Sequence, residues 1–417
     1  MARLAVRAEA RATARRTPAR NDGGRLVTEP ARQSPAAAIA AATALNLPFG
    51  SIYAFSVFLH PMEKLLSLTR AELSFVFALA TVVFTVGMNL APYLFGAAAP
   101  WVLVLFCSAV STLGIVLAAT TQGLAQLAIG YGVLFGLGGG IAYIVVQQGV
   151  NLMVRSHKGL VNGYVVSLYP AGAMIAAPLF GWAIAEWGVR ATLGGLAATL
   201  GLTGLATVWF TLRGGVPLRP QTAPAAMAPS DRRPILFYKL WTVFFLAAAA
   251  GLTVLSQAAG MIAAYGGSAA LALFATTYIT GCIAAARLSG GWMVDRFAIP
   301  HVMAGAQAFA LLGSVVRTLW PGPLVSMFTL AMSGMGYGFI SGASAGAVAL
   351  YWSAAFYGRD ASRLYIAWCA AAVSLPVLAG WLFDLTGGYH TAVIIAGCGN
   401  LLGIAVALTL PRQSGRA

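Results

Sequence analysis

Long apolar runs dominate the chain, and short polar, glycine-rich or proline-rich breaks separate them at regular intervals. A run of roughly 20 apolar residues is long enough to cross the hydrocarbon core of a bilayer as an α-helix. The pattern therefore predicts an all-α integral membrane protein with twelve transmembrane helices. Their expected ranges are 36–60, 72–96, 101–119, 123–153, 159–185, 189–212, 237–264, 268–293, 300–319, 323–350, 362–385 and 389–410.

One long break interrupts the apolar pattern, and it is rich in proline and arginine. We interpret residues 213–236 as a cytoplasmic linker between two six-helix bundles. The bundles are predicted at residues 35–212 and 237–411, with a short tail at 412–417.

Glycines recur at every fourth position in one predicted helix of each half, about 200 residues apart. A spacing of four places the glycines on one helix face, where small residues let two backbones approach closely. The halves are therefore expected to be pseudo-symmetric. The two rows are Gly132, Gly136 and Gly140, and Gly334, Gly338, Gly342 and Gly346.

Charged residues make up 8% of the chain and apolar residues 59%, which excludes an ordinary soluble domain. If both ends of the chain are cytoplasmic, the tails and cytoplasmic loops hold 20 of the 25 lysines and arginines. This asymmetry follows the positive-inside rule and predicts a multi-pass protein of the bacterial inner membrane, embedded in the lipid bilayer. The net charge of +15 does not indicate nucleic-acid binding, because the cations lie in tails and loops.

Residues 1–34 differ in composition from the rest of the chain: they are rich in arginine and alanine and poor in acidic residues. We interpret them as a disordered basic cytoplasmic tail. An organellar transit peptide has a similar composition, and a start codon placed too far upstream is a further alternative.

Arg287 is the most informative residue, because it lies inside an apolar run that extends from Leu271 to Val294. It precedes Asp295, at the expected helix end, by eight residues, or about 12 Å, which places it near the membrane midplane. A lone cation there costs at least about 2.5–3.5 kcal/mol by insertion scales. The helix holds no acidic residue to neutralise it. We therefore expect Arg287 to bind an anionic ligand; a structural role, such as capping carbonyls of another helix, is the alternative.

The loop after the predicted helix 268–293 reads Gly291-Trp-Met-Val-Asp295-Arg296. This pattern, the helix count and the repeat offset resemble the major facilitator superfamily. The resemblance implies a gating latch in which the Asp295 carboxylate faces a helix N-terminus in one state. The usual copy after the second helix is missing here, because that region reads Gly96-Ala-Ala-Ala-Pro100. A latch in one half only is expected.

Further segments resemble the oxalate/formate antiporter family, which is related to monocarboxylate transporters. They include Gly50-Ser-Ile-Tyr53, Gly159-Leu-Val-Asn-Gly163, Arg287 with Asp295 eight residues later, and Pro376 to Tyr389. The resemblance implies that Arg287 binds substrate carboxylate and that aromatic residues enclose the anion. The matching aromatic positions are Tyr53, Tyr143, Tyr169, Tyr337 and Trp368.

Two amides extend this prediction, because Gln147 and Asn151 follow Tyr143 by one and two helical turns. They are expected to line the same face.

Two departures from the family pattern narrow the range of candidate substrates and transport modes. The antiporter pattern adds a lysine in the eleventh helix, but this chain has no lysine after Lys239. One cation balances one negative charge, so a monoanion such as formate, lactate or pyruvate is favoured over oxalate. Proton-coupled carriers of the wider group have an aspartate where this chain has Ile283. Exchange or facilitated diffusion is therefore favoured over proton symport.

Gly342-Ala-Ser344-Ala-Gly346 matches a hydrolase nucleophile pattern but lies in an apolar helix, so we expect no catalytic residue and no enzyme activity. The four cysteines lack metal-ligand spacing, and no cofactor is expected. The sequence thus predicts a secondary transporter of a small carboxylate, active as a monomer. Other major facilitator carriers, for drugs or sugars, and a carboxylate sensor that does not transport remain alternatives.

Overall fold

The computed structural model describes residues 33–220 and 233–412, and these ranges contain only helices and short connections. Within them, 11 helical stretches are long and apolar enough to cross a membrane. One of these, α8 (Lys158–Arg213), has 56 residues. It would measure about 84 Å as one straight helix, nearly three hydrocarbon thicknesses. Gly188, with φ of +80°, breaks α8 at the position where the sequence predicts two crossings.

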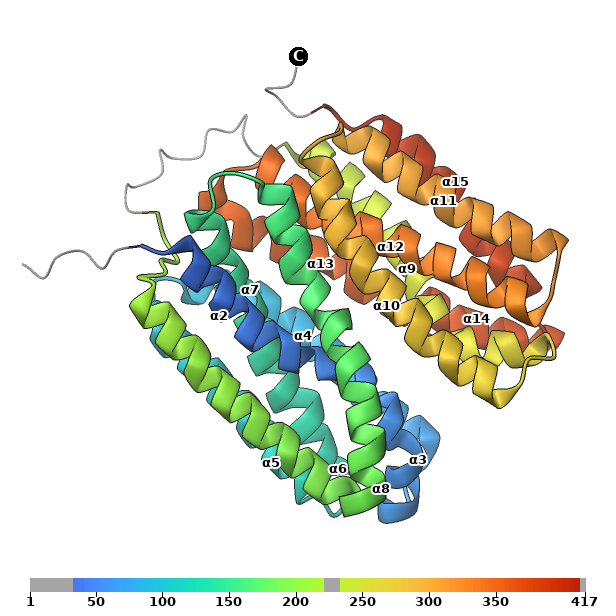
Figure 1. Ribbon diagram of the computed structural model, residues 1–417, viewed down its shortest axis with the longest axis horizontal. Helices are drawn as coiled ribbons and strands as arrows, with labels where there is room; N and C mark the ends of the chain where they lie inside the picture. The colour runs from blue at the N-terminus through green and yellow to red at the C-terminus, as the bar shows by residue number, and fades with distance from the viewer. Residues whose placement is uncertain (1–32, 221–232, 413–417) are drawn as a thin grey trace, which may run out of the picture. The chain divides into compact units, whose positions relative to one another are not determined.

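The other helices follow one another with short connections (Figure 1). They are α2 (Pro35–Phe49), α3 (Ser56–Leu66), α4 (Arg70–Leu94), α5 (Pro100–Ala119), α6 (Leu124–Leu127), α7 (Gly136–Met153), α9 (Pro234–Ala264), α10 (Ala269–Val294), α11 (Ile299–Leu319), α12 (Pro323–Tyr351), α13 (Tyr357–Val373), α14 (Leu375–Thr386) and α15 (His390–Leu408). Three short segments, η1 (Gly50–Ala54), η2 (Ala128–Phe135) and η4 (Ala354–Phe356), complete them.

The first predicted helix is not continuous. The 3₁₀ segment η1 separates α2 from α3, where the sequence pattern predicts one helix over 36–60. A Cβ at Gly50 would overlap the carbonyl oxygen of Tyr169, so η1 lies directly against α8. This close approach, together with Pro48 just before it, changes the helix type at a point that hydropathy does not mark.

The eleventh predicted helix is also divided. It begins at Tyr357, five residues before the predicted start, and Ser374 interrupts it with φ of −103° and ψ of −85°. Pro376, the second residue of α14, lacks the N–H that a continuous helix would need there. The fourth predicted helix keeps its span but contains the π-helical segment η2.

Helices α2 to α8 form one bundle and α9 to α15 the other, seen as blue to green and yellow to red in Figure 1. Within the bundles α4 packs on α7, and α10 packs on α12. Contacts of α8 with α10 and of α4 with α13 join the halves. This is the predicted pair of six-helix bundles. The residues predicted as tails lie almost wholly outside the described ranges, as does 221–232 of the predicted linker.

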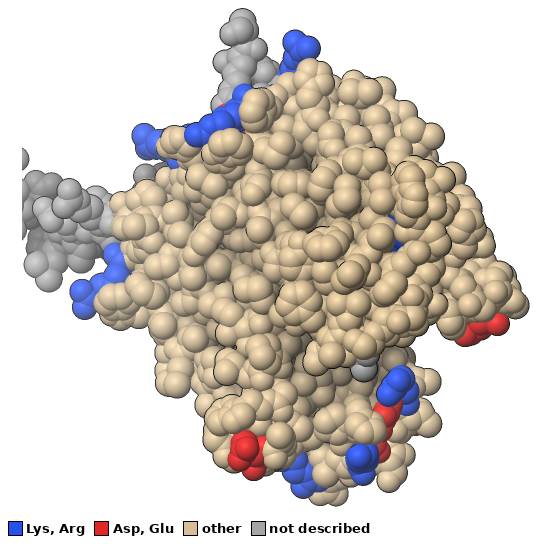
Figure 2. Space-filling view, turned by 45° about the vertical axis from the view of Figure 1, so that its right-hand side comes forward, with Lys and Arg blue, Asp and Glu red and all other residues tan. Residues whose placement is uncertain are grey.

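A broad belt of nearly uncharged surface separates the charged side chains at the two ends of the helices (Figure 2). Large apolar side chains are exposed along this belt, among them Leu273 at 73%, Leu202 at 68% and Trp187 at 62%. In water such exposure would be costly, but in a bilayer these side chains meet lipid.

The two ends of the helices are distinguished by their contacts. We call the end where α2 begins and α15 ends the terminal face. There Ser34 N donates to Gly214 O over 3.1 Å, and Lys239 Nζ donates to Thr409 O over 3.2 Å. The other end, the opposite face, carries the connection between α3 and α4, where Arg70 Nε donates to Glu63 Oε1 over 2.9 Å.

The glycine rows lie at close helix contacts, as their spacing predicts. A Cβ at Gly140 of α7 would overlap the carbonyl oxygen of Phe84 in α4. A Cβ at Gly342 of α12 would overlap the carbonyl oxygen of Arg287 in α10. Ser344, the centre of the hydrolase-like pattern, is 1% exposed on the same helix.

Replacing Gly342 by alanine should force α12 away from α10. Overpacking of this kind costs about 1–3 kcal/mol, so the variant should unfold at a temperature several degrees lower, measured by intrinsic fluorescence. Gly305→Ala is the matched control, because no atom lies within 4 Å of a Cβ built at this glycine of α11. Equal unfolding temperatures for the two variants would contradict the close contact.

Candidate functional site

Arg287 lies on α10 with 4% of its surface exposed. Its Nη1 donates to Val166 O of α8 over 2.9 Å, and its Nη2 donates to Tyr337 Oη of α12 over 2.8 Å. The guanidinium carbon lies 5.2 Å from the centre of the Tyr337 ring, close enough for a cation–π contact. Within residues 33–220 and 233–412, no acidic side chain forms a salt bridge with Arg287. Its Nε has no hydrogen-bond partner there.

The carbonyl of Val166 is available because of a proline one turn later. In a regular helix this oxygen would accept the N–H of residue 170, but Pro170 has none. Arg287 therefore satisfies an acceptor that α8 cannot satisfy itself. This hydrogen bond is of the kind expected from the alternative to anion binding, in which Arg287 caps a carbonyl of another helix.

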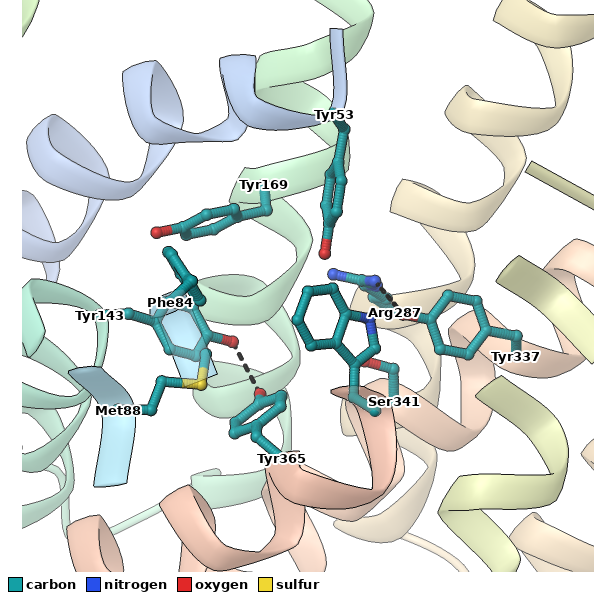
Figure 3. A pocket seen from close by; sticks show the side chains of 10 residues that line it. Tyr53, Phe84, Met88, Tyr143, Tyr169, Arg287, Tyr337, Ser341 and Tyr365 are labelled. Atoms are coloured by element: carbon teal, nitrogen blue, oxygen red, sulfur yellow. Dashed lines mark hydrogen bonds between the residues drawn. The ribbon is translucent and has the colours of Figure 1, made fainter. Parts of the chain in front are cut away.

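Aromatic side chains surround the guanidinium (Figure 3). The hydroxyl of Tyr53 points toward Arg287, and the Tyr53 ring lies 6.2 Å from Tyr169 and 6.3 Å from Trp368, centre to centre. Tyr143 lies edge-on to Tyr169 at 5.0 Å. The structure thus brings together all five predicted aromatic residues, from η1, α7, α8, α12 and α13.

Two cavities meet at Arg287. A chamber of about 20 Å³, room for about one water molecule, lies on the side of the terminal face. A vestibule of about 400 Å³ lies on the side of the opposite face, where Ser56 and Ser74 line it. Arg287, Tyr53 and Trp368 line both cavities. Ile283, one turn before Arg287, is part of the vestibule wall.

The terminal side of the chamber is closed by contacts between the two halves. The hydroxyls of Tyr143 and Tyr365 lie 2.7 Å apart and share a hydrogen bond. Asn89 Nδ2 of α4 donates to Ser362 O of α13 over 3.1 Å. A ligand at Arg287 therefore reaches the vestibule and not the terminal face in this conformation.

Four chamber residues escaped the sequence analysis, namely Phe84, Met88, Ser341 and Tyr365. Two of them had a usable signal. Tyr365 precedes Trp368 by three positions and Ser341 follows Tyr337 by four, so each shares a helix face with a predicted residue.

The two predicted amides line neither cavity in this conformation, and their contact with a ligand stays a prediction. Gln147 and Asn151 are buried on α7 on the terminal side of the Tyr143–Tyr365 contact. Asn151 pairs with Asn162 through hydrogen bonds of 2.8 and 2.9 Å. Each helical turn adds about 5.4 Å, which carries both amides past the floor of the chamber.

The predicted gating residues lie where α10 ends. Asp295 Oδ1 accepts from Gly159 N over 2.8 Å, and Oδ2 accepts from Leu160 N over 2.7 Å. These N–H groups belong to the first turn of α8, where a carboxylate is favoured by the helix dipole. Gly291 packs against Gly163, and Arg296 stacks on Trp292 at 4.3 Å. The geometry is that of a latch from one half to the other.

The sequence matches the Major Facilitator Superfamily over residues 37–345, about three quarters of the chain. This chain belongs to that superfamily. It is therefore a multi-pass membrane protein of a transporter family, not of an enzyme family.

Solved structures share the fold. The proton:xylose symporter XylE bound to 6-bromo-6-deoxy-D-glucose is 15% identical, with a TM-score of 0.70 over 91% of this chain and 96% of that one. The transporter FucP in the outward conformation is 16% identical, with a TM-score of 0.64 over 90% and 99%. A further structure, of the E. coli fucose:proton symporter FucP, is 15% identical, with a TM-score of 0.63 over 91% of this chain and 100% of that one. A comparison with curated proteins finds no match.

Because Pro170 leaves the Val166 carbonyl free for Arg287, residues 170 and 287 should be energetically coupled in this major facilitator protein. Pro170→Ala restores an N–H that competes for the Val166 oxygen, so it should stabilise the protein less when Arg287 is present than in an Arg287→Gln background. A double-mutant cycle in chemical unfolding should give a coupling of about 1–3 kcal/mol, the cost of a charged donor left unsatisfied.

Pro178→Ala is the control, since Pro178 lies on the same helix. No described side chain that lines a cavity donates to the carbonyl four residues before Pro178, whereas Arg287 donates to the one four residues before Pro170. It should show no coupling to Arg287. Additive effects of Pro170→Ala and Arg287→Gln, within about 0.5 kcal/mol, would contradict the capping role.

Proposed function

We propose that this protein transports a small organic monoanion, a monocarboxylate such as formate, lactate or pyruvate, by alternating access and in exchange for another anion. The observation that carries the proposal is Arg287: a buried cation at the junction of two cavities, unpaired with any acid of the described ranges. A charge in this position is costly unless a ligand balances it.

The hydrogen-bonding groups around Arg287 favour an acceptor-rich ligand. Arg287 Nε and Trp368 Nε1 can only donate, and neither has a hydrogen-bond partner among residues 33–220 and 233–412. The hydroxyl of Tyr169 also lacks one. A carboxylate offers two oxygens with several lone pairs and pairs well with guanidinium. The aromatic walls limit the size of its substituent.

The charge of the lining favours a monoanion and exchange. Among the described residues that line the chamber and the vestibule, Arg287 is the single charged side chain. One negative charge neutralises the site, whereas a dianion would leave a charge unpaired. No described carboxylate lines either cavity, which argues against proton symport through a buried acid.

The mechanism follows from this charge. In the empty site the cation disfavours closure of the apolar vestibule around it. A bound anion neutralises Arg287, and the halves then rock about the site while the Asp295 contact with α8 breaks. Net return of the empty carrier is slow, so exchange should exceed net flux. We place the terminal face in the cytoplasm of a bacterium by its excess of basic residues, and the protein in the inner membrane, working as a monomer.

A carrier for sugars is the main rival, because the similar structures include xylose and fucose symporters coupled to protons. At 15–16% identity that similarity supports the fold alone. A sensor that binds carboxylate without transport is the second rival. Arg287 is compatible with the sensor but has no evident task in binding a neutral sugar.

Counterflow into proteoliposomes loaded with one unlabelled carboxylate tests the proposal. Labelled formate, lactate, pyruvate, oxalate and xylose are offered outside in turn. We expect uptake of at least one monocarboxylate, weaker uptake of oxalate and none of xylose. Arg287→Gln should reduce the uptake at least about 100-fold, because a buried carboxylate would lose its charged partner.

Arg317→Gln is the matched control, since Arg317 is as deeply buried, at 3% exposure, but lines neither cavity. It should keep transport. Uptake of xylose, or carboxylate uptake that survives Arg287→Gln, would contradict the proposal. Carboxylate binding without counterflow would support the sensor instead.

A further inference from the structure

The N-terminus of α13, on the terminal face, is held by a residue of the other half. The first N–H groups of a helix have no partner within the helix. Gly358 N, in the first turn of α13, donates to Gln148 Oε1 of α7 over 2.8 Å. Gln148 is 0% exposed, so water does not replace this bond.

The same amide also donates. Gln148 Nε2 lies 3.2 Å from Ala354 O, in the segment before α13, and 3.4 Å from Leu218 O, after α8. One side chain thus bonds to the start of α13, to η4 and to the connection between the halves. All three partners of Gln148 are backbone groups, so the contact does not depend on another side chain.

Gln148 bonds the helix start that corresponds, in the repeat, to the one that Asp295 bonds. Asp295 bonds the first turn of α8, where the fifth crossing begins, and the eleventh crossing begins with α13. The chain after α4, where a second acidic latch would lie, has no charge between Gly96 and Pro100. Instead the ring of Phe95 packs against Gly358, where a Cβ would lie 2.8 Å from it.

The chemistry of the two positions explains why one is an acid and the other an amide. Asp295 meets two N–H donors, and a carboxylate accepts from both. Gln148 meets one N–H and two carbonyl oxygens, so the side chain must accept and donate at once. A carboxylate there would place an oxygen against two carbonyl oxygens.

We propose that Gln148 is a second latch of the terminal face, an uncharged counterpart of Asp295 that the resemblance to known transporters does not assign. The terminal face is then closed by two latches of unlike chemistry, one on each half. Both must break before a ligand leaves on that side. Gln148 acts on the gate and not on the ligand, so it is a positioning residue.

Distances between two spin labels test the proposal without any substrate. The labels replace Ser156, between α7 and α8, and His301, in the first turn of α11; both are exposed on the terminal face, in different halves. Cys107, Cys282, Cys369 and Cys398 are first replaced by alanine. Pulsed electron–electron double resonance then gives the distribution of label-to-label distances, and from it the fraction of molecules with the terminal face open.

Gln148→Met keeps the size of the side chain but loses all three bonds. It should raise the open fraction at least about fivefold, the effect of one hydrogen bond of ordinary strength. Gln148→Glu should open the face as well, although it keeps an acceptor for Gly358 N. Asp295→Asn should act in the same direction. Gln126→Met is the control, because Gln126 bonds within its own half, to Leu117 O and Thr120 Oγ1.

An unchanged distance distribution in Gln148→Met, with Asp295→Asn opening the face, would overturn the proposal. So would a Gln148→Glu variant that is closed more tightly than the parent, since the donor role would then be wrong. If Gln148→Met does not fold, the Gln148→Glu result decides alone. None of these outcomes depends on which solute is carried, so they are separable from a failure of the anion proposal.

Discussion

A guanidinium in the middle of an apolar helix bundle must find hydrogen-bond acceptors without water, and the structure around Arg287 follows from this constraint. Pro170 leaves the oxygen of Val166 unpaired, and Arg287 takes it; Tyr337 supplies a hydroxyl and a ring face. Gly163 and Gly342 allow α8 and α12 to approach the backbone of Arg287 itself. Helices of both halves therefore meet at one charge, which remains without an acidic partner in the described ranges.

The two sides of this charge differ, and the difference indicates one state of a transport cycle. On the terminal side, hydrogen bonds of Asp295, Asn89, Gln148 and the Tyr143–Tyr365 pair join the halves. On the other side a vestibule of about 400 Å³ reaches Arg287. Each of the closing hydrogen bonds contributes only modestly to the stability of the closed state. The free energy gained when a ligand neutralises one buried charge is therefore of the right order to shift the equilibrium between the closed and the open terminal face.

Run length and charge placement sufficed to predict the membrane crossings and the break at Gly188. They also marked Arg287, which the structure places between two cavities. Hydropathy did not predict the break at Gly50, because that break depends on how closely α8 approaches. Pro376 marks the break at Ser374 in the sequence, but the apolar run continues through it. Helical periodicity gave the face of Gln147 but not its depth along α7, and the residue lines neither cavity in this conformation. The partners of the Val166 carbonyl and of Gln148 lie between 70 and 210 residues away, and no local pattern marks them.

The central claim is that a carboxylate, and specifically its charge, is what Arg287 binds. The most direct test compares the thermal stabilisation of the purified protein by lactate with that by lactamide, its neutral amide of nearly equal shape. We predict that lactate raises the unfolding temperature in a saturable way, that lactamide does not, and that Arg287→Gln removes the difference. Equal stabilisation by the two compounds, or a lactate effect that persists in Arg287→Gln, would contradict the account.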